Sequence, residues 1–183
     1  MQSPCIYPMP IDFSPSQKYH DAMSVDPEKL RVAMRKWATG VTIVTAQDQG
    51  IRHGMTVSSF TSVSLEPPLV LVSLERGTKT HELVEKSGRF GVSILAEQYL
   101  SISDRFAGRQ TEQSDRFEGL DSFQLVTGIP LLEGALAVFD CQVVSSYESG
   151  THTLFIGEVL GVMNAENGSP LLYYDQDYHI LKE

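Results

Sequence analysis

The sequence predicts a mainly β protein whose strands form an antiparallel barrel with helices at its periphery. Two observations support this prediction: segments rich in β-branched and apolar residues outnumber the helical segments, and most connections between them are short. The chain has 183 residues, which is enough for one domain with its own hydrophobic core. Its apolar fraction of 42% and charged fraction of 20% are ordinary for a soluble globular protein.

The first 24 residues differ from the rest of the chain. They contain four prolines and little periodicity, so we expect an extended or partly disordered arm. Apolar side chains such as Ile6 and Phe13 leave open that the arm drapes over a partner subunit instead. The folded domain is expected to span residues 25–183.

The segment after the arm predicts a helix followed by a hairpin. Asp26 can cap a helix, Pro27 suits its first position, and Gly40 ends it. Two β-rich runs within residues 41–57 are joined by a turn at 47–50, which predicts a pair of antiparallel strands.

The middle of the chain predicts alternating strands and helices. Residues 69–74 form a continuous apolar run, which favours a strand buried on both faces. A helix over 78–86, capped by Thr78 or Thr80, a strand over 90–95 and a helix over 97–106 follow. The polar segment 108–119 predicts a mobile surface loop. The last third predicts five strands, over residues 123–127, 135–147, 152–164, 171–174 and 178–181.

The charge and cysteine content exclude several classes of function. Fourteen Lys and Arg residues against 23 Asp and Glu give a net charge of −9, which argues against nucleic acid or an anionic membrane as the main partner. Cys5 and Cys141 lie far apart and no Cys/His spacing typical of a metal site exists, so we expect neither a disulfide nor a bound metal. Without a signal peptide or a run of about 18 apolar residues, we expect a cytoplasmic protein with no membrane span.

A segment dense in hydroxyl groups lies between two β-rich runs and ends at a double proline. Hydroxyls and free backbone N–H groups at the mouth of a sheet can hold a phosphate without a metal. The alternative is that Ser and Thr are simply common at strand ends and turns. The hydroxyl-bearing residues of this segment are Thr56, Ser58, Ser59, Thr61, Ser62 and Ser64.

This segment belongs to a series of motifs that resembles a known family. Gly54-Met-Thr-Val-Ser-Ser-Phe-Thr-Ser-Val-Ser64 and Pro67-Pro-Leu69 lie at its centre. Phe90-Gly-Val-Ser-Ile-Leu95, Phe106-Ala-Gly108 and Gly150-Thr-His-Thr-Leu-Phe-Ile-Gly-Glu-Val159 follow in order. Over residues 30–181 the chain resembles the flavin reductase family with the FMN-binding split barrel. The resemblance implies an antiparallel Greek-key split β-barrel of the FMN-binding type, with peripheral helices.

The resemblance also implies an enzyme that transfers hydride from NADH or NADPH to FMN or FAD. The reduced flavin would supply a separate monooxygenase component, and the chain would form a homodimer, because a split-barrel site typically lies between two subunits. The sequence distinguishes neither FMN from FAD nor NADH from NADPH. Two alternatives are a flavin carrier of the same fold without NAD(P)H turnover and a barrel that binds another cofactor, such as haem.

The flavin-contacting residues are carried over from the family's motifs. Met55, Thr56 and Val57 match positions that bind the pyrimidine edge of the flavin ring. Ser73 and Phe106 lie near the flavin in the family, although a serine at the barrel mouth and a core phenylalanine are alternative interpretations. The phosphate-binding positions correspond to Ser58, Ser59 and Ser62 and to the start of the next helix, Thr78, Lys79 and Thr80.

His152 is the candidate catalytic residue. It begins a strand after the turn Ser149-Gly150-Thr151, in the motif that the family associates with the nicotinamide side of the site. Thr151 stands where the family usually has Asp, which changes the hydrogen bonding of the turn. The alternative is a histidine at a turn exit without a ligand. His81, in the first turn of a predicted helix, is expected at the surface.

Overall fold

The computed structural model describes residues 25–109 and 115–181, and the arm expected over residues 1–24 lies outside this part. Contacts divide the chain into two compact units, with the boundary between Met34 and Arg35. The first unit contributes the helix α1 (Pro27–Met34), which begins as predicted, since the backbone N–H of Glu28 donates to Asp26 Oδ1 at 2.9 Å. No residue of α1 is buried.

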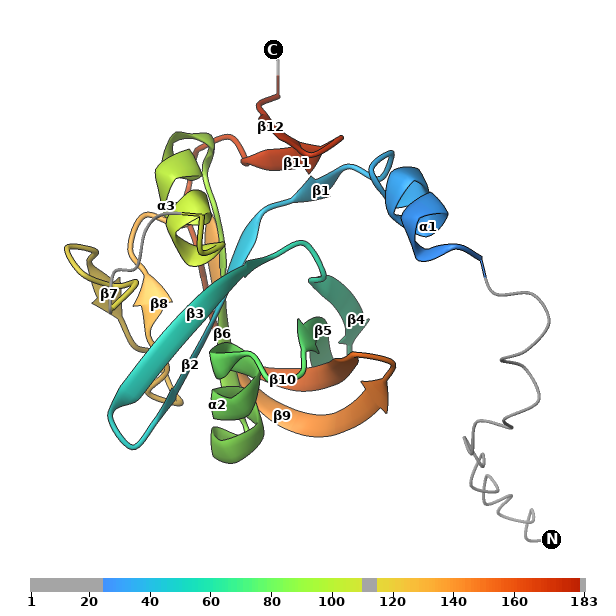
Figure 1. The fold of residues 1–183 in the computed structure, drawn as a ribbon. Helices are drawn as coiled ribbons and strands as arrows, with labels where there is room; N and C mark the ends of the chain where they lie inside the picture. The colour runs from blue at the N-terminus through green and yellow to red at the C-terminus, as the bar shows by residue number, and fades with distance from the viewer. Residues whose placement is uncertain (1–24, 110–114, 182–183) are drawn as a thin grey trace, which may run out of the picture. The chain divides into compact units, whose positions relative to one another are not determined.

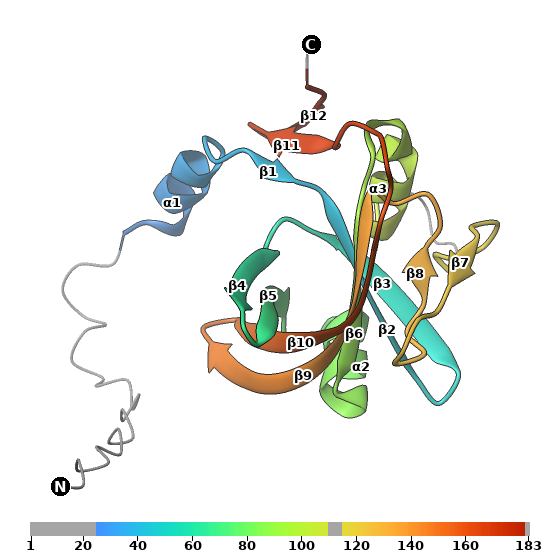
Figure 2. The same ribbon diagram turned by 180° about the vertical axis from the view of Figure 1, so that it is seen from behind.

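The second unit is built around a curved, seven-stranded antiparallel sheet (Figures 1 and 2). Its strands are β2 (Thr42–Asp48), β3 (Ile51–Val57), β4 (Thr61–Leu65), β5 (Pro68–Glu75), β6 (Arg89–Ile94), β9 (Ala137–Ser149) and β10 (His152–Asn164). They lie in the order β3-β2-β6-β9-β10-β5-β4, so that consecutive strands such as β5 and β6 are separated in space. This arrangement confirms the predicted mainly β, antiparallel fold and is consistent with a split barrel.

Two small sheets and several helices surround the large sheet in the described residues. One small sheet joins β1 (Thr39–Gly40), β11 (Leu172–Tyr174) and β12 (Asp177–His179), and the other joins β7 (Ser122–Phe123) and β8 (Leu131–Leu132). The helix α2 (Lys79–Ser87) follows β5, while the 3-10 helix η2 (Glu97–Tyr99) and the helix α3 (Leu100–Phe106) follow β6. Both views show α2 and α3 on opposite sides of the β2–β3 hairpin.

The buried side chains form two clusters on the two faces of β2. The larger cluster lies inside the curve of the sheet and joins strands from distant places in the order, including Val44 of β2 and Val72 of β5. The smaller cluster packs α3 and the segment that follows it, with the rings of Phe106 and Phe117 5.2 Å apart between centroids. Ile43 belongs to the smaller cluster although it is adjacent to Val44, because successive side chains of a strand point to opposite faces.

The prediction that β5 is buried on both faces was wrong for the single chain. Val70, Val72 and Leu74 are buried, but they alternate with residues that keep part of their surface exposed. One face of β5 therefore packs in the core, whereas Leu71 and Ser73 lie on the outer face.

Two predictions of surface position were also wrong. His81 is only 4% exposed, because α2 directs it toward β10, where its Nε2 lies 2.8 Å from Thr153 Oγ1. Phe117, in the segment expected to form a surface loop, is 1% exposed because it packs against Phe106. Residues 110–114 of that segment lie outside the described part of the chain.

The strand predicted over residues 123–127 is reduced to the short β7. The backbone N–H groups of Val126 and Thr127 instead donate to Asp140 Oδ2 of β9, each at 2.7 Å. The buried carboxylate of Asp140 therefore accepts these hydrogen bonds in place of a neighbouring strand.

None of the helices in the described part of the chain has the length and apolarity that a membrane span requires. Within the same residues, no group of three or more His, Cys, Asp or Glu side chains is placed to hold a metal ion. Cys141 is a free thiol whose burial raises its pKa to about 12. It therefore remains a neutral core residue at physiological pH.

Candidate functional site

The open edge of β3 is the centre of the candidate site. In the part of the chain that the structure describes, β3 pairs on one side only, with β2. On its other side the carbonyl oxygen of Gly54 accepts a hydrogen bond of 2.8 Å from Arg116 Nη1. Residues two apart on a strand direct their backbone groups to the same side, so the N–H and C=O of Thr56 also face this edge. The edge thus presents a donor and an acceptor next to each other.

A pocket of about 160 Å³ lies beside this edge. It is bounded by the end of β3, the segment after α3, and the strands β11 and β12. It is lined by Val41, Thr56, Val57, Ser58, Ala107, Arg109, Tyr173 and Tyr178. Three of the residues predicted to contact a flavin therefore line one pocket, together with residues from the C-terminal part of the chain.

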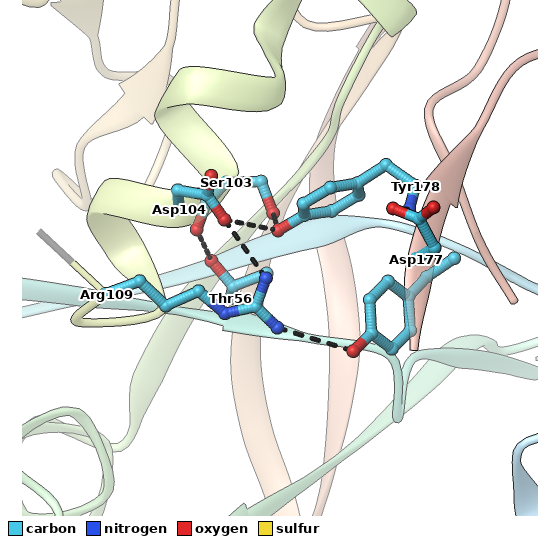
Figure 3. A network of polar contacts seen from close by, with 7 residues as sticks. Thr56, Ser103, Asp104, Arg109, Asp177 and Tyr178 are labelled. Carbon is cyan, nitrogen blue, oxygen red and sulfur yellow. Dashed lines mark hydrogen bonds and ion pairs between the residues drawn. The ribbon is translucent and has the colours of Figure 1, made fainter. Parts of the chain in front are cut away.

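A network of hydrogen bonds forms one wall of the pocket (Figure 3). Thr56 Oγ1 donates to the carbonyl oxygen of Ser103 at 2.6 Å, which ties β3 to α3. Ser103 Oγ lies 2.8 Å from Tyr178 Oη, and the Tyr178 hydroxyl donates to Asp104 Oδ1 at 3.1 Å. Burial raises the pKa of Tyr178, so its hydroxyl stays protonated as a donor at neutral pH. The network fixes the C-terminal sheet to the helix.

Arg109 completes this wall, and the sequence did not single it out. Its Nη1 donates to Asp104 Oδ1 at 3.1 Å and its Nη2 donates to Tyr173 Oη at 3.3 Å. The guanidinium also lies over the ring of Tyr178, 5.7 Å from the centroid. The hydrogen bond with Tyr173 is the first cause of the raised pKa of Arg109. Arg109 follows the Phe106-Ala-Gly108 motif, which is the one sequence signal that could have drawn attention to it.

The N-terminus of α2 lies on the other side of β3. Thr78 caps this helix, since the backbone N–H of His81 donates to its Oγ1 at 3.4 Å. Thr78 Oγ1 is also 3.9 Å from Met55 Sδ, so the cap and β3 are in contact. Lys79 is exposed at the first position of the helix. A helix N-terminus with a neighbouring lysine favours an anion.

Several other predicted residues have side chains that are already occupied within the chain. Thr80 is buried and its Oγ1 lies 2.8 Å from His53 Nδ1. Phe106 is buried in the smaller core cluster. Ser59 Oγ donates to the carbonyl oxygen of Ser73 at 2.8 Å and accepts from the Ser73 N–H at 3.2 Å, which joins the segment after β3 to β5. Ser58 and Ser62, by contrast, are exposed.

His53 has an unusual electrostatic environment on β3. Burial, with a smaller contribution from the charges of Arg116 and Lys79, lowers its pKa to about 4. The ring is therefore neutral at physiological pH, and its Nδ1 can form a hydrogen bond with Thr80 Oγ1. This contact positions the first turn of α2 relative to β3.

His152 lies away from the pocket in the single chain. It is the first residue of β10, where it pairs with Glu75 of β5, and its Nδ1 is 2.9 Å from Thr151 Oγ1. Since Thr153 points inward to His81, His152 points to the outer face of the sheet. Glu75 also accepts a hydrogen bond from Thr78 Oγ1 through its carbonyl oxygen, so His152 is close to the α2 end of the site.

Comparisons with known proteins identify the family. The flavin reductase like domain family matches residues 34–182. An NADH-dependent flavin reductase from Rhodococcus sp. is 42% identical over 86% of this chain and 88% of its own length. The reductase subunit HsaB of a flavin-dependent monooxygenase from Rhodococcus jostii (strain RHA1) is 36% identical over 86% of this chain and 79% of its own length.

The fold agrees with this result. The solved structure of the flavin reductase PheA2 in its native state is similar with a TM-score of 0.80 and 40% sequence identity. The similarity covers 87% of this chain and 100% of that chain. The curved antiparallel sheet, the motifs along β3 and these relatives lead to one conclusion: the chain belongs to the flavin reductase like domain family.

Proposed function

We propose that this protein is an NAD(P)H:flavin oxidoreductase, which transfers hydride from a nicotinamide to FMN or FAD. Family membership over residues 34–182 and relatives named as NADH-dependent flavin reductases support this activity. The observation that carries the proposal is the open edge of β3, which lies between a pocket on one side and the N-terminus of α2 on the other.

The flavin ring fits the edge of β3. The pyrimidine part of a flavin alternates hydrogen-bond donors and acceptors, and the outward N–H and C=O of Thr56 offer the matching pair. The side chains of Met55 and Val57 share the face of β3 opposite to the Thr56 side chain, and Val57 also lines the pocket, so they supply apolar surface next to this edge. In this arrangement Thr56 contributes its backbone, because its hydroxyl is bound to Ser103.

The phosphate fits the N-terminus of α2. The cap residue Thr78, the exposed Lys79 and the exposed hydroxyls of Ser58 and Ser62 supply donors and one positive charge. Thr80 acts indirectly, since its side chain is buried against His53.

Three further residues of the proposed site have supporting roles. Ser59 and Ser73 hold the segment between β3 and β5 in place. Phe106 supports β3 from the core: a Cβ atom at Gly54 would lie only 2.7 Å from Phe106 Cε1, so the phenylalanine ring packs directly on the backbone of Gly54.

The chemistry requires little from the protein beyond positioning. When bound, the flavin accepts the hydride, and the nicotinamide supplies it. The chain holds the two rings in contact, excludes water and orients them, which are the contributions expected where the reacting groups carry their own chemistry. We assign His152 to the nicotinamide side, with a role in orientation rather than proton transfer.

A homodimer would bring the remaining parts of the site together. The outer face of the sheet presents Leu71 of β5, which pairs with Ile156 of β10, and Leu154 pairs with Ser73 on the same face. Tyr147 of β9 continues this face and is 54% exposed. An apolar face of this kind favours burial against a second copy. Because His152 points to the same face, dimerisation would place it at the interface.

The dimer is tested by its assembly state. Ile156→Glu is expected to yield monomers in multi-angle light scattering and to lose flavin binding. The matched control is Ile51→Glu, since Ile51 is exposed at the other end of β3 from Thr56. A wild-type chain that is monomeric at micromolar concentration would refute the dimer.

A separate monooxygenase is the proposed recipient of the reduced flavin. A relative at 36% identity is named as the reductase subunit of a flavin-dependent monooxygenase. The reduced flavin is expected to diffuse from this chain to the monooxygenase.

Activity is tested in two steps. Oxidation of NADH, followed at 340 nm with added FMN or FAD, is expected to saturate in both substrates. Anaerobic mixing followed by ultrafiltration is then expected to show reduced flavin in the filtrate. Absence of NADH and NADPH oxidation would instead favour a flavin carrier, and a haem spectrum of the purified protein would favour another cofactor.

A further inference from the structure

The pocket beside Thr56 contains one charged residue that the proposed flavin site does not use. Among residues 25–109 and 115–181, eight line this pocket, and of these Arg109 alone carries a charge. The chain as a whole has a net charge of −9, so an anionic ligand needs a local cation to offset the long-range repulsion. Arg109 provides this charge on the side of β3 opposite to Lys79.

The contacts of Arg109 leave it able to bind a ligand. A guanidinium has five N–H donors, and its partners among residues 25–109 and 115–181 engage one on Nη1 and one on Nη2. Both distances, 3.1 and 3.3 Å, are at the long end of the range for such bonds. Half of the side chain, 51%, is exposed. Planar donor pairs of this type bind phosphate groups in a bidentate manner.

Asp104 would keep a partner if Arg109 turned toward a ligand. Its Oδ1 also accepts from the Tyr178 hydroxyl, which Ser103 holds from the other side. The Asp104 carboxylate would therefore keep a hydrogen-bond donor when the guanidinium moves, which avoids the free-energy cost of an unpaired acceptor.

The two tyrosines beside Arg109 provide an aromatic wall. The rings of Tyr173 and Tyr178 meet edge to face, with centroids 5.5 Å apart, and both line the pocket. Aromatic walls next to an arginine suit a ligand that combines a planar ring with an anionic group.

We propose that Arg109 binds the diphosphate of a dinucleotide, which the aromatic wall of Tyr173 and Tyr178 helps to orient. This inference rests on the proposed flavin reductase activity. NADH, NADPH and FAD all carry a diphosphate, whereas FMN has a monophosphate and dihydronicotinamide riboside has no phosphate. A comparison of these compounds therefore shows whether the diphosphate bound by Arg109 belongs to the nicotinamide cofactor or to FAD.

The test compares Arg109→Gln and Arg109→Lys with the wild type. The hydride donors are NADH and dihydronicotinamide riboside, and the acceptors are FMN and FAD, in all four combinations. The matched control is Arg89→Gln, because Arg89 lies at the start of β6 and its Nη1 donates to the carbonyl oxygen of Thr127, away from the pocket. Circular dichroism and thermal unfolding confirm that each variant is folded.

The expected result is a selective loss. Arg109→Gln lowers kcat/KM for NADH by roughly 10- to 100-fold, as for a lost hydrogen bond to a charged group, and leaves kcat/KM for the riboside within about 2-fold. Arg109→Lys retains the charge but not the bidentate geometry and recovers part of the loss. A loss seen with FAD but not FMN supports the same role for Arg109 and identifies the flavin as the source of the diphosphate.

Two outcomes overturn the inference. One is unchanged kinetics in all four combinations, and the other is an equal loss with the riboside and FMN, which would indicate a purely structural role. A wild-type protein that oxidises neither NADH nor the riboside would refute the proposed function itself, so the two failures are distinguishable.

Discussion

The hydroxyl of Thr56 is bonded to the carbonyl oxygen of Ser103, at 2.6 Å, and not directed to the edge where its backbone is open. One residue thus has two separate roles: its side chain attaches β3 to α3, and its N–H and C=O remain available to a ligand. A substitution of the Thr56 side chain therefore tests the attachment of β3 to α3 and leaves the ligand contact of the backbone in place.

Thr56→Val tests this division. The variant keeps the shape of the side chain but removes one of the two donors to the Ser103 carbonyl oxygen, which retains the backbone N–H of Ala107 at 2.9 Å. We therefore expect a loss of about 1 kcal/mol in the free energy of unfolding, as for one hydrogen bond. Flavin affinity should change by less than about 3-fold, because the backbone N–H and C=O proposed to contact the ligand are unchanged. Urea denaturation and flavin titration measure the two quantities. Thr61→Val, at an exposed position of β4, is the control. Unchanged stability with a large loss of affinity would show that the hydroxyl binds the flavin directly.

Ser58→Ala and Ser59→Ala should have different effects. Ser58 is exposed and we propose that it contacts the phosphate, so its removal is expected to weaken flavin affinity by about 1.5–3 kcal/mol, as for a lost hydrogen bond to a charged group. Ser59 bonds to Ser73 in both directions, and its removal lowers stability first. Flavin titration and thermal unfolding of both variants separate the roles. Equal flavin affinity for Ser58→Ala and the wild type would remove Ser58 from the phosphate site.

His152→Ala should affect the nicotinamide more than the flavin. His152 is at the start of β10 on the outer face, close to the N-terminus of α2. We expect a change in kcat or KM for NADH with flavin affinity within about 2-fold, as for a residue that contacts one ligand only. Steady-state kinetics at saturating flavin provide the measurement. His179→Ala, near the C-terminus of the described residues, serves as the control. Identical kinetics for wild type and His152→Ala would make His152 a turn residue.

His53 should make stability depend on pH in a defined window. Its pKa in the folded chain is about 4, below the ordinary value of 6.5, mainly because of burial. Between these values the unfolded chain binds more protons than the folded one, so stability increases with pH across this interval. The contribution is complete above pH 6.5 and is lost as the pH falls toward 4.

His53→Gln isolates this effect, since it removes the titrating group. Thermal unfolding of both proteins between pH 5.5 and 7.5 should show a steeper decline for the wild type as the pH falls. Parallel curves for the two proteins would mean that His53 is as accessible in the folded chain as in the unfolded one.

Much of the fold could be predicted because local signals marked its elements. The β2–β3 hairpin follows from the turn at residues 47–50, and β3 has the bounds that the sequence indicated. The same holds for β10, which begins after Gly150. In both cases turn residues adjoin β-branched runs, so the signal is contained within about ten residues.

Other features depend on contacts between distant segments. His81 was expected at the surface because the first turn of a short helix is usually exposed, but its partner Thr153 lies 72 residues further along the chain. Phe117 is buried although its sequence neighbours are polar, because Phe106 and Arg52 pack on its ring. Local composition does not encode such pairings.

The candidate site shows the same limit. The positions along β3 were accessible through the motif, whereas the pocket beside them is closed by Arg109, Tyr173 and Tyr178. These three come from two separate regions of the chain, and the sheet order that brings them together is known only from the fold.

Arg116 has a consequence for the behaviour of the chain in concentrated solution. Its Nη1 donates to the carbonyl oxygens of both Gly54 and Phe106, at 2.8 and 2.7 Å. An uncovered edge strand invites pairing with the edge of another molecule, which leads to aggregation. The guanidinium blocks this pairing at Gly54 while Thr56, two residues further on, stays accessible. The protein thereby limits its exposed strand edge to a length that suits a small molecule and is too short for a second β-strand.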